Sequence, residues 1–70
     1  MKLNSRVKVN QSSCIGDLKF SDEPNDKYNP FDCEGTIINT NNPKVKTLPY
    51  IVLWDNGFTN SYEKCNLIEL

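Results

Sequence analysis

The chain has 70 residues, with eight basic and nine acidic side chains, no histidine and a net charge of −1 at pH 7. A chain of this length is expected to form one domain with a small core, since roughly 60% of its unfolded surface is buried on folding, and this leaves little room for a deep catalytic pocket. The balanced charge lacks the excess of Lys and Arg that phosphate binding needs. No apolar run reaches the length of a signal peptide or a membrane span. We therefore expect one soluble, cytoplasmic domain over residues 1–70, complete from Met1.

The first predicted strand covers residues 5–10, where two basic residues alternate with two valines in the period-2 pattern of a half-buried strand. Residues 11–32 are predicted to form a long loop, because they show no sustained periodicity and contain one glycine and two prolines among many Ser, Asn and Asp residues. Four apolar residues in this segment predict that the loop packs onto the sheet: Ile15, Leu18, Phe20 and Phe31.

A second strand is predicted over residues 34–40, where Gly35 allows a bend or a close backbone contact. Residues 41–49 are a turn region, and residues 50–54 are the third strand. Strand alternation divides this third strand into two apolar faces, with Tyr50, Val52 and Trp54 on one and Ile51 and Leu53 on the other. We expect one face to fill the core and the other to be covered by the long loop, by another copy of the chain or by a partner.

The sequence Asp55-Asn56-Gly57 predicts a hairpin, because Asn and Gly accept the positive φ that tight hairpins need. A fourth strand over residues 58–62, a helical turn over 63–66 and a short fifth strand over 67–70 complete the prediction. The fold class is therefore expected to be all-β, as a five-stranded SH3-like barrel with a long first loop and a short helical turn before the last strand. Closure of the sheet would leave few backbone groups unpaired at its edges.

The segments EGTIINT (34–40) and YIVLWDNGFTNSYEKCNLIEL (50–70) resemble two known families. The order of Gly-Thr-Ile, Tyr-x-Val-x-Trp-Asp-Asn-Gly, Asn-x-Tyr and a final Leu is similar to the small barrel domain of mind-bomb and HERC-type ubiquitin ligases. It is also similar to the photosystem I reaction-centre subunit PsaE. The resemblance covers residues 6–9 and 34–70, and it implies an SH3-like barrel that binds other proteins and is not itself an enzyme.

The leading hypothesis is a non-enzymatic protein-binding module. Lys, Asn, Ile, Tyr and Phe have AT-rich codons, and their use indicates a bacterium or bacteriophage as the source, so we expect a small modulator of a host protein complex. Five aromatic residues are the candidate partner-binding side chains: Tyr28, Phe31, Trp54, Phe58 and Tyr62. In SH3 and Tudor relatives an aromatic groove between loops takes proline-rich peptides or methylated lysine. The alternative is that these residues only form the core and pack the hairpin, which explains Phe58 least well.

Three acidic residues of the long loop, Asp22, Glu23 and Asp26, are expected either to be solvated or to contact a basic patch of the partner and set its orientation. The alternative function is an RNA-, DNA- or ribonucleoprotein-associated factor of the KOW or Tudor type. It would use a basic patch made of Arg6, Lys8, Lys44, Lys46 and Lys64.

The three cysteines, Cys14, Cys33 and Cys65, are expected to be free thiols. Their number and spacing match no disulfide framework, and without histidine or a Cys-x-x-Cys pair they do not predict a zinc site. Neither a metal nor a cofactor is expected. The chain has no histidine for acid–base work, no phosphate loop and no nucleophile elbow. An enzyme would need a pore shared between several copies of the barrel, so it would require self-association.

Overall fold

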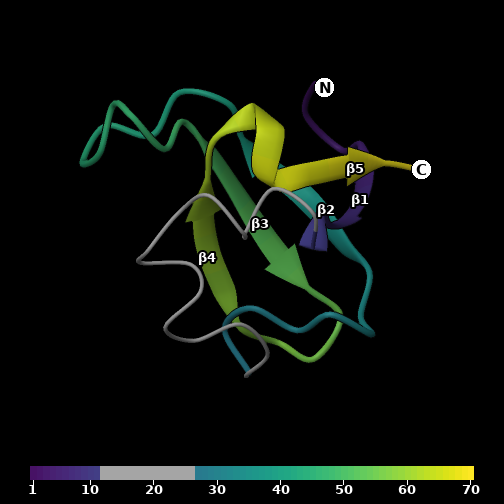
Figure 1. The fold of residues 1–70 in the computed structure, drawn as a ribbon. Helices are drawn as coiled ribbons and strands as arrows, with labels where there is room; N and C mark the ends of the chain where they lie inside the picture. The colour runs from purple at the N-terminus through teal and green to yellow at the C-terminus, as the bar shows by residue number, and fades with distance from the viewer. Residues whose placement is uncertain (12–26) are drawn as a thin grey trace.

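A computed structural model describes residues 1–11 and 27–70 of the chain, and these residues form one antiparallel β-sheet (Figure 1). The strands are β1 (Arg6–Val9), β2 (Gly35–Asn39), β3 (Tyr50–Trp54), β4 (Thr59–Tyr62) and β5 (Leu67–Glu69), and a 3-10 turn, η2 (Lys64–Asn66), precedes β5. Each strand lies within the segment that the sequence predicted for it, which confirms the all-β fold and the helical turn before the last strand. No helix in the described part of the chain is long and apolar enough to cross a membrane.

The strands are arranged in the order β4-β3-β2-β1-β5, and every neighbouring pair is antiparallel. β4 and β5 therefore stand at the two ends of the sheet. Among the described residues no backbone ladder joins these two end strands, so the predicted closure into a barrel is not present in the strand pairing. The sheet is nevertheless curled, because side chains from both end strands reach one common core.

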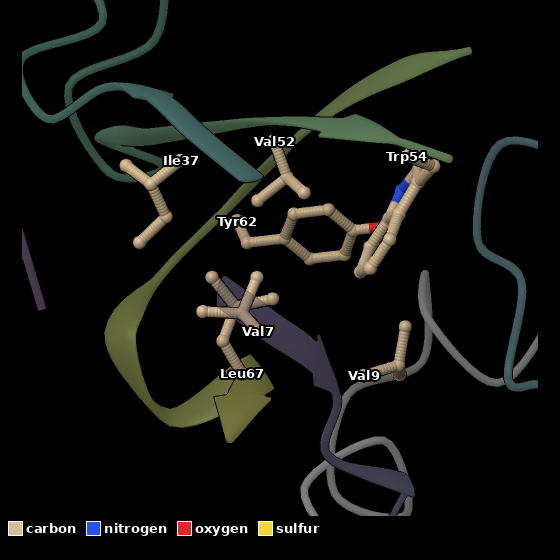
Figure 2. Packing of buried hydrophobic residues seen from close by; sticks show 7 residues of the cluster. All are labelled: Val7, Val9, Ile37, Val52, Trp54, Tyr62 and Leu67. Atoms are coloured by element: carbon tan, nitrogen blue, oxygen red, sulfur yellow. The ribbon is translucent and has the colours of Figure 1, made fainter. Parts of the chain in front are cut away.

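That core is a single cluster on the inner face of the curled sheet (Figure 2). All five strands contribute to it, through Val7, Val9, Ile37, Val52, Trp54, Tyr62 and Leu67. Burial of each large apolar side chain is worth about 1.5–3 kcal/mol relative to leaving it exposed, so this cluster is a major source of stability for the described sheet. Met1, Phe31, Cys33 and Tyr50 pack against the cluster at its margin.

The third strand shows which of its two apolar faces belongs to the core. Val52 and Trp54 are buried, whereas Leu53 is 40% exposed and Ile51 is only half-buried. The prediction that one face fills the core is therefore confirmed for the face of Val52 and Trp54. The opposite face of β3 remains on the outer surface of the sheet.

Gly35 allows the indole of Trp54 to lie directly against the backbone of β2. The two residues are register partners, and a Cβ atom added at Gly35 would lie 2.5 Å from Trp54 Cε3 and 2.6 Å from Val52 Cγ1. Real Cβ atoms do not approach other carbon atoms so closely, so only glycine fits this position without moving the core. The close contact predicted for this glycine is confirmed.

The β3–β4 hairpin is closed by the predicted Asp55-Asn56-Gly57 loop. The Gly57 N–H donates to the Trp54 carbonyl at 2.9 Å, and the Trp54 N–H donates to the Phe58 carbonyl at 2.8 Å. Gly57 has the expected positive φ, 94°. Asn56 does not have a positive φ, since Asn4 is the only non-glycine residue with one in the described segments. Asn56 therefore contributes through its side chain, since its Oδ1 accepts a hydrogen bond from the Phe58 N–H at 3.0 Å.

The two glycines should respond differently to alanine. We expect Gly35→Ala to lower the free energy of unfolding by about 3 kcal/mol, because the methyl group displaces the core. Gly57→Ala should cost about 1–2 kcal/mol through its left-handed backbone alone, since nothing lies within 4 Å of the added Cβ. Urea unfolding would measure both changes. Fluorescence of the single tryptophan should shift in the folded Gly35→Ala variant and remain unchanged in Gly57→Ala; an unshifted spectrum in both would contradict the Trp54–Gly35 contact.

Candidate functional site

The five candidate aromatic residues lie at two depths in the structure. Trp54 and Tyr62 are buried and their rings meet edge to face, with centroids 5.7 Å apart. Phe31 is half-buried against the core. Tyr28 is 45% exposed, and Phe58 is half-buried beside it. The burial of Trp54 and Tyr62 favours the core alternative for these two residues. Of the other three, Phe31 packs against the core, whereas Phe58 packs against the exposed Tyr28.

Tyr28 and Phe58 lie together at the surface, and we call them the Tyr28–Phe58 pair. Lys27 lies over both rings. The two rings meet edge to face, with centroids 5.0 Å apart and an interplanar angle of 76°. The Lys27 ammonium lies 5.3 Å from each ring centroid. A cation at this distance is attracted by the negative face of an aromatic ring. The positive charge of Lys27 is therefore held beside both rings.

The buried hydroxyl of Tyr62 connects the core to the segment that carries Tyr28. It accepts a hydrogen bond from Trp54 Nε1 at 3.2 Å, and the two atoms face each other in Figure 2. Its single hydrogen can be donated to Asn29 Oδ1 at 2.9 Å or to the Tyr28 carbonyl at 3.1 Å. Each polar group in this buried network has a partner, which is the condition under which such a network adds rigidity and stability.

Two asparagines of the hairpin hold the same segment from the outside. Asn56 Nδ2 donates to the Lys27 carbonyl at 2.9 Å, and Asn60 Nδ2 donates to the Tyr28 carbonyl, also at 2.9 Å. Because Asn56 also accepts from the Phe58 N–H, one side chain links the backbones that carry both rings. The Tyr28–Phe58 pair is therefore positioned by hydrogen bonds to its backbone before any partner arrives.

Several residues of this site were not identified from the sequence: Lys27, Asn29, Asn56 as a side-chain contact, and Asn60. The available signal was the high asparagine content of the chain. Asparagine side chains commonly hydrogen-bond to irregular backbone, but the composition does not say which carbonyls they reach. The predicted acidic contacts Asp22, Glu23 and Asp26 lie outside the described residues.

Arg6, a member of the predicted basic patch, is surrounded by acceptors. Its two terminal nitrogens donate to both carboxylate oxygens of Asp55, at 3.0 and 2.7 Å. The same guanidinium donates to Thr36 Oγ1 at 2.7 Å and reaches Glu34 Oε1 at 3.4 Å. The hydrogen bonds from Arg6 to Asp55 lower the pKa of Asp55 below its ordinary value of 3.8, and burial opposes this shift. The pKa of Arg6 is raised chiefly by its hydrogen bond to Asp55.

The four lysines of the predicted basic patch lie on separate parts of the fold. Lys8 is in β1, Lys44 and Lys46 are in the connection between β2 and β3, and Lys64 begins η2. The charge of Arg6 is balanced by two carboxylates. The patch is thereby reduced to four exposed lysines, which lie in a strand, in a connection and in a 3-10 turn.

The thiols and acids of the described segments do not gather into one cluster. Cys33 is a free thiol, the exposed Cys65 thiol donates to Glu63 Oε1 at 2.8 Å, and Cys14 lies outside the described residues. Within residues 1–11 and 27–70, His, Cys, Asp and Glu side chains form no group that could hold a metal ion. Comparison of the chain with protein-family models, curated proteins and solved structures finds no match. The arguments for function therefore rest on the geometry of this surface.

We predict that Tyr62→Phe lowers the free energy of unfolding by about 1–3 kcal/mol, because buried polar atoms of Trp54 and Asn29 lose a hydrogen-bond partner. The matched control is Tyr50→Phe, at the cross-strand partner of Tyr62. The Tyr50 hydroxyl makes no hydrogen bond to the residues that the structure describes, so its removal should have a small effect. Equal urea midpoints for the two variants would contradict the network.

The Arg6–Asp55 pair predicts a dependence of stability on pH. A carboxylate whose pKa is lowered in the folded state stabilises the protein at pH values above its ordinary pKa of 3.8, and this contribution disappears as the pH falls through the lower folded pKa. We expect Asp55→Asn to melt at a lower temperature than the parent chain at pH 6. The difference between the two melting temperatures should shrink as the pH falls below about 4, and a difference that is constant from pH 6 to pH 3 would argue against the pair.

Proposed function

We propose that this chain is a non-enzymatic, SH3-like domain that binds another protein through the Tyr28–Phe58 pair. The observation that carries the proposal is an aromatic pair, with Tyr28 exposed and Phe58 half-buried, whose backbone is fixed by hydrogen bonds from Asn56, Asn60 and Tyr62. Aromatic side chains dominate the binding energy of many protein interfaces because each covers a large area with few rotatable bonds. Fixing the backbone beforehand reduces the entropy that binding must overcome.

The SH3-like part of the proposal rests on the order of the elements and on the curl of the sheet. Five short antiparallel strands, a 3-10 turn before the last strand and one core fed by all strands are features that such barrels share. The motif Trp54-Asp55-Asn56-Gly57 forms the hairpin expected from the resemblance to the mind-bomb and HERC-type domain. From that resemblance we infer protein binding. From the amino-acid composition we infer a bacterial or phage modulator that acts in the cytoplasm.

The nucleic-acid alternative receives less support from the described residues. Phosphate binding needs clustered and available cations, and the guanidinium of Arg6 is occupied by Asp55 and Glu34. An enzyme also receives little support, since the described surface brings together no acid–base pair or activated nucleophile around the aromatic residues.

Binding can be tested by capture from lysate of the host with the tagged chain, in parallel with and without nuclease. We predict one protein partner that is lost with Phe58→Ala and with Tyr28→Ala. Truncation of a central aromatic anchor at an interface costs at least about 2 kcal/mol, so the affinity for the purified partner should fall by roughly 30-fold or more. Leu3→Ala is the control, because Leu3 is an exposed apolar residue that is not part of the pair.

Urea unfolding of each variant would separate lost binding from lost folding. Unchanged affinity in both aromatic variants, with folding intact, would rule out the Tyr28–Phe58 pair as the contact surface. Loss of every partner on nuclease treatment would instead favour the nucleic-acid alternative.

A further inference from the structure

The outer face of the sheet carries a second hollow, separate from the Tyr28–Phe58 pair. It lies over β3 and β4 beside the connection between β2 and β3, and it has a volume of about 450 Å³. Neither ring of the Tyr28–Phe58 pair lines it, although Asn60 of β4 both lines the groove and donates to the Tyr28 carbonyl. We call it the outer groove. Its apolar floor includes Ile51, Pro43 and Val45, with Ser61, Thr59 and Lys44 at its sides.

Asn42 holds the connection in place as one wall of the groove. Its side chain is 5% exposed, and its Nδ2 donates to the Leu48 carbonyl and to Ser61 Oγ, each at 3.1 Å. Its Oδ1 accepts from the Lys44 N–H at 3.0 Å, and its own N–H donates to the Pro49 carbonyl at 3.1 Å. One buried amide therefore ties the connection to β4 and fixes the backbone of Lys44, so the groove is formed before a ligand enters.

β2 is irregular next to Asn39, which lines the groove. The register between β2 and β3 shifts between Ile37 and Asn39, so Ile38 has no partner in the ladder and its side chain is 47% exposed. A bulge of this kind bends the strand and changes the direction of its side chains. The exposed side chains of Ile38 and Leu53 extend the apolar surface of β2 and β3 beyond the floor of the groove.

The charge of the outer groove is positive. Lys44 is the single charged residue among those that line it, and no carboxylate is among them. In the described segments the ion pairs involve Met1, Arg6, Glu34, Asp55 and Glu69, and none includes Lys44. The remaining polar lining is uncharged hydroxyl and amide groups, which can bind a peptide backbone. The groove thus combines an apolar floor, hydrogen-bonding sides and one cation.

From this charge and lining, we propose that the outer groove binds an extended segment of a partner protein in which an apolar side chain stands next to a carboxylate. The apolar side chain contacts Ile51 and Val45, and the carboxylate meets Lys44. A small pocket with few well-placed polar groups is the usual form of such sites. A nucleic acid is the weaker match, because one lysine supplies little of the charge needed to bind a phosphate backbone.

The proposal can be tested by following backbone amide resonances of the full chain during titration with two blocked peptides. The probes are acetyl-Glu-Leu-Glu-Leu-amide and the charge-reversed acetyl-Lys-Leu-Lys-Leu-amide. We expect the acidic peptide to shift the amides of Val45, Ile51 and Ser61, with an affinity about tenfold higher than that of the basic peptide. Lys44→Ala should weaken the acidic peptide roughly fivefold, as expected for loss of one exposed ion pair.

Lys46→Ala is the matched control, because Lys46 is an exposed lysine in the same connection that does not line the groove. Equal responses to the two peptides, equal effects of the two lysine variants, or shifts confined to Tyr28 and Phe58 would each overturn the proposal. A short oligouridylate that shifts the groove amides, when the acidic peptide does not, would assign the groove to nucleic acid. Phe58→Ala should leave the peptide response unchanged, so failure of the groove and failure of the proposed function give different results.

Discussion

The position of the Trp54 indole determines much of the rest of this structure. One edge of the ring lies against the backbone of Gly35, which sets how closely β2 and β3 approach in the core. Its nitrogen donates to the Tyr62 hydroxyl, which places β4 and then the segment of residues 27–30. The backbone of Tyr28 is therefore two hydrogen bonds away from the Trp54 indole. A change that moves the indole should alter the surface as well as the stability.

Asparagine side chains do in this chain what longer secondary structure does in larger domains. Asn42 ties the β2–β3 connection to β4, while Asn56 and Asn60 tie the segment before β2 to the hairpin. Each amide satisfies a backbone carbonyl of an irregular segment, which would otherwise need water or would not hold one conformation. Both the Tyr28–Phe58 pair and the outer groove are built in this way, on backbone that short strands alone would not order.

The strands could be predicted from the sequence because their signals are local. Period-2 alternation, the Asp55-Asn56-Gly57 turn and the glycine at position 35 each depend on neighbouring residues. The candidate site depends on contacts between residues far apart in the sequence, and no local pattern in the sequence indicates such contacts. The sequence could not show that Trp54 and Tyr62 are buried while Tyr28 and Phe58 are accessible, since all four are large aromatic residues near the hairpin or the loop. Nor could it show that Arg6 pairs with Asp55, because many charge pairings are compatible with one composition.

An open sheet also has consequences for solubility at high concentration. Among the described residues the outer edges of β4 and β5 pair with no further strand, and proteins usually protect such end strands with short length and polar side chains. β4 meets both conditions, since it has four residues and three of them are Thr59, Asn60 and Ser61. β5 is short but less polar, and the exposed Ile68 and Leu70 lie on it or next to it. Unwanted polymerisation of the folded chain is therefore expected to begin at the C-terminal strand, and a charged residue in place of Ile68 is the substitution that should suppress it.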